Sequence, residues 1–303
     1  MGKHAYCIIA HTDFYCLENL LKLIDDKRND IYLLIDKKSH IFYQNVKQKK
    51  DSLIQYSNFQ ILHRDLCPKI SWGDASQMKA ELQLFKAVIE SGNTYDYIHL
   101  ISGSDLPIKS QDSIHDFFDN IDKGTNFIDF ANDVENIKIK QKRVENYHFL
   151  LKWQKNRYEI FNKLWNKFDL ALIIIQKKLH IKRNWKNLQL QKGTNWVSIT
   201  QDFAQYLVQN FKRIEKKYKY IPCVDEIYKQ TEIFNSEFRN TIFDFNHEIS
   251  LSTRLIDWNK GRPYVWTEHD FLEIIKSSSF FARKFSSNKD KKIIDKIRDH
   301  LLK

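Results

Sequence analysis

The first third of the chain alternates short apolar runs with segments in which apolar residues recur every three or four positions. Short apolar runs bounded by turn residues predict strands, whereas the three-to-four recurrence predicts helices. These patterns predict strands at 5–10, 31–35, 59–62 and 97–101, and helices at 16–25 and 77–91. The resulting order, β-α-β-β-α-β, indicates an α/β fold of the kind that binds nucleotides.

The middle of the chain, roughly 134–192, has a different pattern that predicts long helices. Within it, residues 164–183 mix large apolar side chains with five cationic ones. This basic amphipathic element has two interpretations: a helix packed on the core with a solvated lysine face, or a helix that lies on an anionic bilayer. The tail, 286–303, predicts another basic helix.

Composition indicates a folded chain with an anionic partner. The 303 residues are 42% apolar and 14% aromatic, which is ample for a core. An excess of 49 Lys and Arg over 38 Asp and Glu gives a formal charge of +11. The charge suits nucleic acid, a phosphate-bearing ligand or an acidic membrane face, and does not choose among them.

Targeting and cysteine signals are weak. No stretch approaches the roughly 20 apolar residues of a spanning helix, and the chain enters its first strand without the apolar region of a secretory signal. We therefore expect a cytoplasmic protein. The four cysteines lack Cys-x-x-Cys spacing, so we expect reduced, mostly buried thiols and neither a zinc site nor disulfides.

The segment 97–110, YIHLISGSDLPIKS, is the most informative stretch of the sequence. An apolar strand ends at Gly103, and Pro107 prevents a helix from starting at once. Ser102, Ser104 and Asp105 should therefore lie at the carboxyl end of a strand, where open α/β sheets bind ligands. The alternative is an ordinary turn capped by Ser and Asp.

Five separated segments, in the same order, resemble glycosyltransferase family 14, which contains the core 2/I-branching β-1,6-N-acetylglucosaminyltransferases and the peptide O-xylosyltransferases. The segments are AYCIIAH at 5–11 with IYLLIDK at 31–37, SWGDASQ at 71–77, the stretch 97–110, KGTNWV at 192–197 with VDE at 224–226, and RLIDW at 254–258 with FFARKF at 280–285. The resemblance implies a single GT-A domain over 1–303, with a mixed central sheet flanked by helices. Residues 1–125 would form the nucleotide-sugar half, and 126–303 the acceptor-binding and catalytic half.

The resemblance also implies inverting transfer from a UDP-sugar without a metal. Most GT-A enzymes hold the donor diphosphate through a divalent cation on an Asp-x-Asp pair, and no such triplet occurs in this chain. Family members use an Arg and a Lys instead, which correspond to Arg254 and Lys284. Fixed cations can stabilise the charge that grows on the leaving UDP. Arg283 is the next candidate, and a lone cation is otherwise most often a surface charge.

The family's Pro-Asp-Glu motif corresponds to Val224, Asp225 and Glu226, with valine in place of proline. The resemblance makes Glu226 the base that removes the acceptor hydroxyl proton. Asp225 would bind the acceptor or cap a helix. Without the resemblance, an Asp-Glu pair at a helix start is most often a cap.

Family positions that contact the nucleotide correspond to Ala10, His11, Asp36 and Trp72. A carboxylate such as Asp36 can accept hydrogen bonds from uracil or ribose, and an aromatic face can cover the base. Trp72 could equally be a core tryptophan at a helix entry, and His11 a buried, hydrogen-bonded histidine.

On the acceptor side, the resemblance implies contacts from Ser104, Asp105 and Asp225, and Trp196 and Trp258 could stack on sugar rings. Charged residues of the family's middle region orient the acceptor, but Arg143, Glu145 and Tyr147 cannot be matched to them individually.

The combined hypothesis is a cytoplasmic, membrane-peripheral, metal-independent glycosyltransferase without a cofactor, which moves N-acetylglucosamine or xylose to a glycan or lipid-linked glycan. The missing amino-terminal anchor, which the Golgi relatives carry, favours a bacterial enzyme of surface polysaccharide synthesis. Two other classes remain open: a basic nucleic-acid-binding module and a non-catalytic membrane-associated scaffold.

Overall fold

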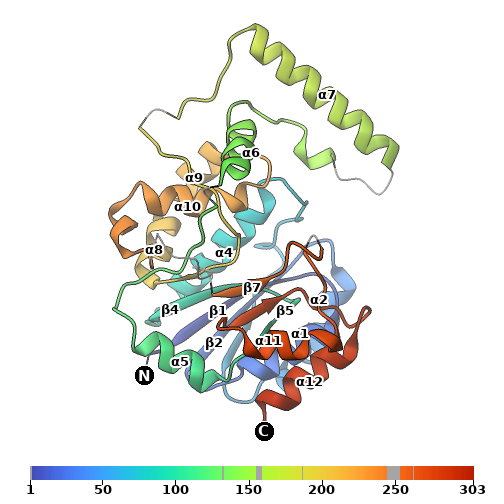
Figure 1. Cartoon of the computed structure of the whole chain (residues 1–303), viewed down its shortest axis with the longest axis vertical. Coiled ribbons are helices and arrows are strands. Elements are labelled where there is room, and N and C mark those ends of the chain that lie inside the picture. The colour runs from blue at the N-terminus through green and yellow to red at the C-terminus, as the bar shows by residue number, and fades with distance from the viewer. Residues whose placement is uncertain (1, 132, 155–158, 186, 244–252, 262) are drawn as a thin grey trace.

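A five-stranded sheet forms the centre of the molecule (Figure 1). The structure is a computed structural model that describes residues 2–131, 133–154, 159–185, 187–243, 253–261 and 263–303. The spatial order of the strands is β3-β2-β1-β4-β6. Their bounds are β1 His4–Ala10, β2 Asn29–Ile35, β3 Asn58–Ile61, β4 Tyr97–Ser102 and β6 Ser198–Ile199.

The sheet is mixed, as predicted. Strands β1, β2, β3 and β4 pair in parallel, and β6 pairs antiparallel with β4. Both faces of β1, β2 and β4 are buried, which explains why their sequences are continuous apolar runs. The parallel arrangement brings the carboxyl ends of β1, β2 and β4 to one edge, where ligand-binding side chains are expected.

Helices cover both faces of this sheet and bury two apolar clusters. Side chains alternate along β1, so Cys7 contributes to one cluster and Ile8 to the other. The first cluster includes residues of α4 (Ser76–Glu90), α8 (Gln201–Gln209), α9 (Phe211–Tyr218) and α10 (Tyr228–Phe234). The second includes residues of α1 (Phe14–Ile24), α2 (His40–Gln48), α3 (Lys50–Leu53), α5 (Gln111–Asp119), α11 (Phe271–Lys276) and α12 (Lys291–Leu301).

A small second sheet joins the end of β4 to the carboxyl-terminal part of the chain. It has the order β5-β8-β7, with β5 at Asp105–Pro107, β7 at Arg254–Ile256 and β8 at Phe281–Arg283. Strand β5 pairs antiparallel with β8, and β7 pairs parallel with it. This sheet places residues 283–285 beside the 102–105 turn, a long-range contact that no local pattern could predict.

The predicted elements of the first third are all present, each within two residues of its expected ends. The sequence patterns missed α2 and α3, which lie between β2 and β3 and carry few buried apolar residues. The tail helix is α12. All four cysteines are free and buried, as predicted.

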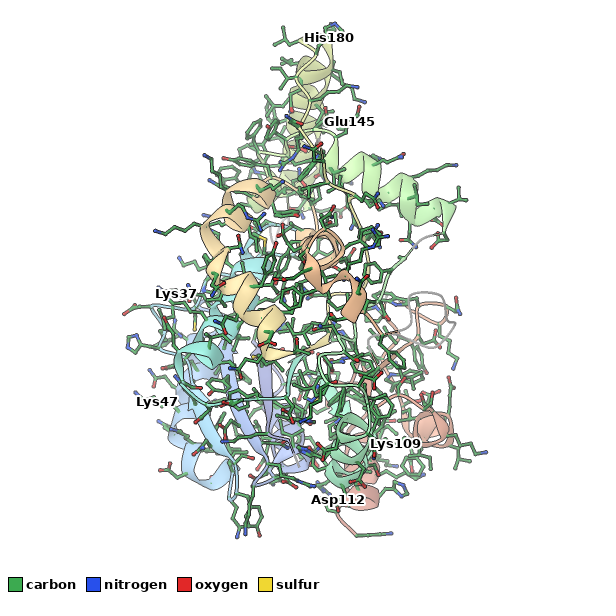
Figure 2. The ribbon with its side chains drawn as sticks, turned by 90° about the vertical axis from the view of Figure 1, so that its left-hand side faces the viewer. Lys37, Lys47, Lys109, Asp112, Glu145 and His180 are labelled. Carbon is green, nitrogen blue, oxygen red and sulfur yellow. The ribbon has the colours of Figure 1, made fainter. Side chains whose placement is uncertain are left out.

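Helix α7 (Glu159–Lys178) stands away from the sheet at one end of the molecule (Figure 1). It follows α6 (Val134–Val144), and Figure 2 shows His180 at the outer tip of this projection and Glu145 nearer the body. The interpretation of this segment as a helix packed on the core is wrong, because its buried residues are the polar Asp169 and Gln176. Among the described residues, no helix combines the length and apolarity needed to cross a bilayer.

Candidate active site

Asp36 follows β2 and lies beside the end of β1. Its backbone N–H donates to the Ala10 carbonyl at 3.0 Å. Its buried carboxylate accepts from the backbone N–H groups of Lys38 at 2.9 Å and Ile70 at 3.2 Å. The structure therefore brings Ala10 and Asp36, two predicted nucleotide contacts, together at the carboxyl edge of the sheet.

The turn between β4 and β5 packs directly against the end of β1. The Gly103 N–H donates to the Ile9 carbonyl at 2.9 Å. A Cβ at position 103 would lie 2.8 Å from the Ala10 Cβ, so only glycine permits this approach. The predicted strand-to-turn arrangement is thus present, with Ser104 partly exposed in the turn.

Asp105 holds an arginine in place. Its carboxylate is almost completely buried and lies 2.6 Å from Nη1 of Arg283, with the Ser102 N–H and hydroxyl donating to it at 2.8 Å. The Arg283 guanidinium also bonds to the Ser102 hydroxyl and lies over the Trp196 ring, 4.6 Å from its centroid. Asp105 and Trp196, both predicted on the acceptor side, here orient a cation; their acceptor contacts stay predictions.

Lys284 comes next in the chain, and its ammonium makes no ion pair within the part of the chain that the structure describes. Desolvation by the surrounding protein lowers the pKa of His11, and the positive charges of Lys284, Lys38 and Arg283 lower it further, whereas Asp36 opposes them. Although nearby protein atoms shield part of the imidazole, His11 as a whole is exposed, so the alternative of a buried histidine is wrong. We call His11, Asp36, Lys38, Arg283 and Lys284 the donor-side cluster.

Arg254 lies outside this cluster. Its buried guanidinium donates to the Val197 carbonyl at 2.8 Å, to the Leu100 carbonyl at 3.2 Å and to the Ser198 hydroxyl at 2.6 Å. Burial lowers its pKa to about 10, and the charge of Asp105 opposes that shift. In this structure Arg254 ties the small sheet to β4 and β6, and a diphosphate contact would require it to leave these partners.

Glu226 ends a single helical turn, Val224–Glu226, and its carboxylate is partly exposed between two cations. Nη1 of Arg143 lies 2.7 Å from Oε2, and Nζ of Lys192 lies 3.6 Å from the same oxygen. The contact assigns Arg143 to the site, which motif matching could not do because α6 is 83 positions away. Glu145 pairs instead with Lys182 at 3.2 Å.

Asp225 lies beside a buried ion pair between Glu81 and Lys229. Burial raises the pKa of Asp225 to about 7, with the charges of Glu81 and Glu226 adding to the shift and Lys229 opposing it. Nζ of Lys229 lies 2.5 Å from Glu81, 2.8 Å from the Asn195 side-chain oxygen and 3.0 Å from the Asp225 carbonyl. The Glu81 and Lys229 side chains are fully buried. The loop that carries Glu226 is therefore held by fixed charges from α4 and α10.

The loop that carries Trp72 contacts both the donor-side cluster and the segment that leads into Glu226. Ile70 contacts Asp36, and the Gly73 carbonyl accepts from the Cys223 N–H at 2.9 Å. Gly73 has a φ of +83°, which favours glycine. The Trp72 side chain is 69% exposed, so the alternative of a core tryptophan is wrong.

The segment 192–196 spans the distance between Glu226 and the donor-side cluster. Its first residue contacts Glu226 and its last, Trp196, contacts Arg283. Four residue steps cover at most about 14 Å of backbone. Gly193 makes this path possible, because its N–H donates to the Glu226 carbonyl at 2.9 Å and a Cβ there would lie 1.7 Å from the Asp129 carbonyl oxygen.

Trp258 is not brought to these residues by any hydrogen bond or ring contact in the described part of the chain. It lies in the loop after β7, 57% exposed, next to Asp257, which accepts from the N–H groups of Asn259 and Lys260. Its stacking on an acceptor sugar stays a prediction.

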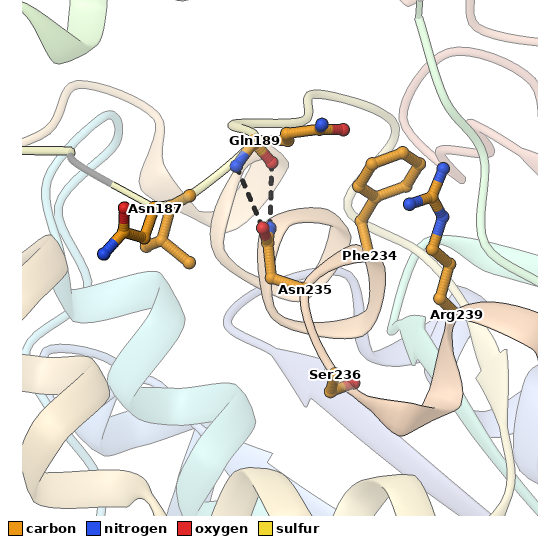
Figure 3. A pocket seen from close by; sticks show the side chains of 7 residues that line it. Asn187, Gln189, Phe234, Asn235, Ser236 and Arg239 are labelled. Atoms are coloured by element: carbon orange, nitrogen blue, oxygen red, sulfur yellow. Dashed lines mark hydrogen bonds between the residues drawn. The ribbon is translucent and has the colours of Figure 1, made fainter.

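A hollow of about 550 Å³ lies away from these residues (Figure 3). It is lined by Asn187, Leu188, Gln189, Phe234, Asn235, Ser236 and Arg239. Its two sides are joined by paired hydrogen bonds between Gln189 and Asn235, each 2.9 Å long. None of the predicted site residues lines it.

Within the described ranges, no group of three or more His, Cys, Asp or Glu side chains is arranged to hold a metal ion. Independence from metal stays a prediction of the sequence.

Comparison with known proteins identifies the family. The chain is 23% identical to xylosyltransferase 2 of Rattus norvegicus over 98% of its own length and 33% of the relative, and 22% identical to the Homo sapiens protein over the same shares. It is 24% identical to beta-glucuronosyltransferase GlcAT14A of Arabidopsis thaliana, over 71% of this chain and 44% of that one.

The chain thus spans about a third of the length of the xylosyltransferases it matches. Among solved structures, apo mouse xyloside xylosyltransferase 1 aligns over 93% of this chain and 97% of that chain, with a TM-score of 0.42 and 11% identity. The profile of the Core-2/I-Branching enzyme family matches residues 4–280, and the chain therefore belongs to that family.

Proposed function

We propose that the chain is an inverting glycosyltransferase that moves a sugar from a UDP-sugar to an acceptor hydroxyl. The acceptor oxygen forms a bond to the anomeric carbon while the bond from that carbon to the diphosphate oxygen breaks, and UDP leaves with the electron pair. The acceptor proton passes to the Glu226 carboxylate. Attack from the face opposite UDP inverts the anomeric configuration.

The observation that supports this proposal most is the placement of Glu226 relative to the donor-side cluster. The segment 192–196 contacts both, so the Glu226 carboxylate and the Arg283 guanidinium lie at the two ends of one five-residue segment. Arg143 and Lys192 hold the carboxylate in one orientation, which fixes it for proton transfer.

Lys284 and Arg283 are the cations that we assign to the diphosphate. A charged guanidinium or ammonium stabilises the negative charge that develops on the leaving group. Asp105 keeps Arg283 in place, and the ammonium of Lys284 lies close enough to His11 to lower its pKa. Arg254 then stabilises the site indirectly, through its hydrogen bonds to the Leu100 and Val197 carbonyls.

For the donor sugar we propose xylose first, because the relatives that match almost the whole chain are named xylosyltransferases. N-acetylglucosamine and glucuronic acid are the next candidates, the latter from the name of the plant relative. A release assay with the three UDP-sugars, with and without a divalent metal, ranks them and tests independence from metal. The acceptor would be a glycan, in a bacterial cell or elsewhere.

Glu226→Gln tests the base. The amide cannot accept the proton, so we expect transfer to fall by about 10²- to 10⁴-fold while UDP affinity is unchanged. Glu145→Gln is the matched control, because Glu145 contacts Lys182 and not the site. Turnover near the original rate in Glu226→Gln would exclude Glu226 as the base.

Lys284→Ala tests the diphosphate contact. Loss of one charge-assisted contact should weaken UDP binding about tenfold, measured by calorimetric titration in EDTA. Lys47→Ala removes an exposed lysine on α2 and should leave the affinity unchanged. If the original chain does not bind UDP in EDTA but binds it with manganese, the metal-independent mechanism is wrong; if it binds under neither condition, the enzyme proposal itself fails.

A further inference from the structure

The apolar residues of α7 face away from the protein. Ile160, Leu164, Phe168 and Ile175 of α7, with Leu179 directly after it, are 45% to 77% exposed. Their spacings of three to four residues and multiples of them place them on one face of the helix. We call these five residues the outer face of α7. Exposed apolar side chains in a continuous row mark a surface that binds something.

A different side of α7, which carries Asp169 and Gln176, attaches it to the body through polar contacts. The Asp169 carboxylate hydrogen bonds to the His148 ring at 2.8 Å. The Gln176 side chain accepts from the Tyr147 N–H and donates to the Tyr147 carbonyl, both at 2.9 Å. These two residues are seven positions apart, so they fix which side of the helix is turned inward. The outer face is therefore held outward by specific hydrogen bonds.

The charges beside the outer face are almost all positive. Lys163, Lys167, Lys177 and Lys178 lie on the exposed part of the helix, where the single acidic residue is Glu159. Asp169, the other acidic residue of α7, is buried against His148. A second copy of this chain would bring the same lysines together, and the whole chain carries +11. An anionic surface is the complementary partner.

Two tryptophans lie where α7 attaches to the body, and one of them is exposed. Trp153 is 47% exposed and stacks on Trp165 of α7, with ring centroids 5.6 Å apart. Tryptophan is enriched at the boundary between headgroups and acyl chains because one end of its ring is polar and the other apolar. No described helix can cross a bilayer, so α7 would lie in the plane of the interface.

We propose that α7 docks the protein on the surface of an anionic phospholipid bilayer, with its outer face among the acyl chains and its lysines among the headgroups. The attachment at Tyr147 and His148 joins the docking helix to the end of α6 that carries Arg143. This inference concerns membrane binding alone and does not depend on the proposed transfer reaction.

The test measures binding of the full chain to sedimented vesicles. Phosphatidylcholine vesicles with about one third phosphatidylglycerol should bind the chain, and pure phosphatidylcholine vesicles should bind it at least about tenfold more weakly. Raising the salt to roughly 1 M should also weaken the binding, since it shortens the screening length to about 3 Å. Equal binding to both vesicle types, or none, would overturn the proposal.

Two pairs of variants distinguish binding through the outer face from nonspecific binding through other exposed side chains. Phe168→Glu with Ile175→Glu should weaken vesicle binding by at least about tenfold for each side chain lost. Ile41→Glu with Leu272→Glu alters apolar residues of α2 and α11 that are even more exposed, and it should leave binding unchanged. Likewise, Lys163→Gln with Lys167→Gln should weaken binding about tenfold or more, and Lys47→Gln with Lys50→Gln should have little effect.

Sedimentation velocity tests the alternative that a second copy of the chain binds the outer face. We expect a monomer for the original chain and for each variant, because the altered side chains are exposed and do not hold the fold together. A dimer that Phe168→Glu with Ile175→Glu abolishes would overturn the bilayer proposal and assign the outer face to a second copy.

Discussion

Helices α4 and α7 have similar amphipathic sequences and opposite surroundings. In α4, Met78, Leu82, Phe85 and Val88 are fully buried against the sheet. In α7, Phe168 and Ile175 recur at the same kind of spacing and are about half exposed. Periodicity therefore predicts that a helix forms and that it has an apolar face, but not what covers that face.

Polar residues make the difference between the two helices. Helix α4 turns Glu81 inward, where Lys229 neutralises it, and the rest of its inner side is apolar. Helix α7 turns Asp169 and Gln176 inward, and the partners of both lie in residues 147–150. A short polar attachment holds α7, whereas the burial of a whole apolar side holds α4.

The largest expected effect is the difference in unfolding free energy between alanine variants of two phenylalanines. Phe85→Ala in α4 should lower the free energy of unfolding by about 3–5 kcal/mol, because it leaves a cavity in the core. Phe168→Ala in α7 should change it by no more than about 0.5 kcal/mol, because that ring is half exposed. Urea unfolding followed by circular dichroism measures both. Similar losses in the two variants would mean that α7 is a core element.

The same contrast explains how much of the fold the sequence could predict. Strands β1, β2 and β4 are buried on both faces, so their apolar runs are unambiguous, and α1 and α4 have both clear periodicity and an apolar neighbour. Helix α2 has only Tyr43 and Val46 buried, which is too little signal. The small sheet depends on pairing between Leu106 and Ala282, and no local pattern carries that information.

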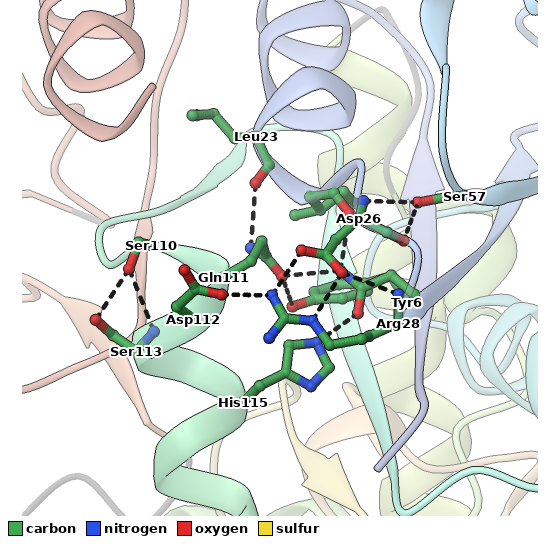
Figure 4. Close-up of polar contacts among 12 residues, drawn as sticks. Tyr6, Leu23, Asp26, Arg28, Ser57, Ser110, Gln111, Asp112, Ser113 and His115 are labelled. Carbon is green, nitrogen blue, oxygen red and sulfur yellow. Dashed lines mark hydrogen bonds and ion pairs between the residues drawn. The ribbon is translucent and has the colours of Figure 1, made fainter. Parts of the chain in front are cut away.

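A second prediction concerns pH and the core on the other face of the sheet. His115 is buried, and its Nε2 lies 2.9 Å from the Asn29 side-chain oxygen; Figure 4 shows it beside Arg28, whose guanidinium contacts Asp26 and Asp112. Burial lowers the pKa of His115 from 6.5 to about 4, and Arg28 adds to the shift.

Because the pKa is lower in the folded chain, protonation favours the unfolded one. This stabilisation is complete above about pH 6.5 and is lost as the pH falls to about 4, by about 3 kcal/mol in total. His115→Gln should reduce the dependence of unfolding free energy on pH over this interval. A part should remain, because burial also lowers the pKa of His4 and of His99. His180→Gln alters the exposed histidine at the tip of the projection and should not. A slope that His115→Gln leaves intact would assign the dependence to other groups.

Part of the candidate site could be predicted from the sequence, and part could not. The end of β2 and the turn after β4 could be predicted because strands specify where Asp36 and Ser104 lie. The contact between Arg143 and Glu226, and the one between Asp105 and Arg283, join segments 83 and 178 positions apart. Arg254 shows the limit of matching by motif: its position was expected to bind phosphate, and the structure places its guanidinium among main-chain carbonyls.

The smallest effect tests the attachment of α7 itself. Asp169→Asn removes the charge from the hydrogen bond to His148 and should cost about 1–2 kcal/mol. Because α7 is held by few contacts, the loss should appear as local opening and not as global unfolding. We expect hydrogen exchange of the α7 amides to accelerate about tenfold, with the amides of β1 unchanged.

Asn166→Ala is the control, since it removes an exposed polar side chain from the same helix. Acceleration confined to α7 in Asp169→Asn would show that this helix opens independently of the sheet, as a docking element can. Equal acceleration in α7 and β1 would show that both open together. In that case α7 would differ from α4 in the exposure of its apolar residues, but it would not open independently of the sheet.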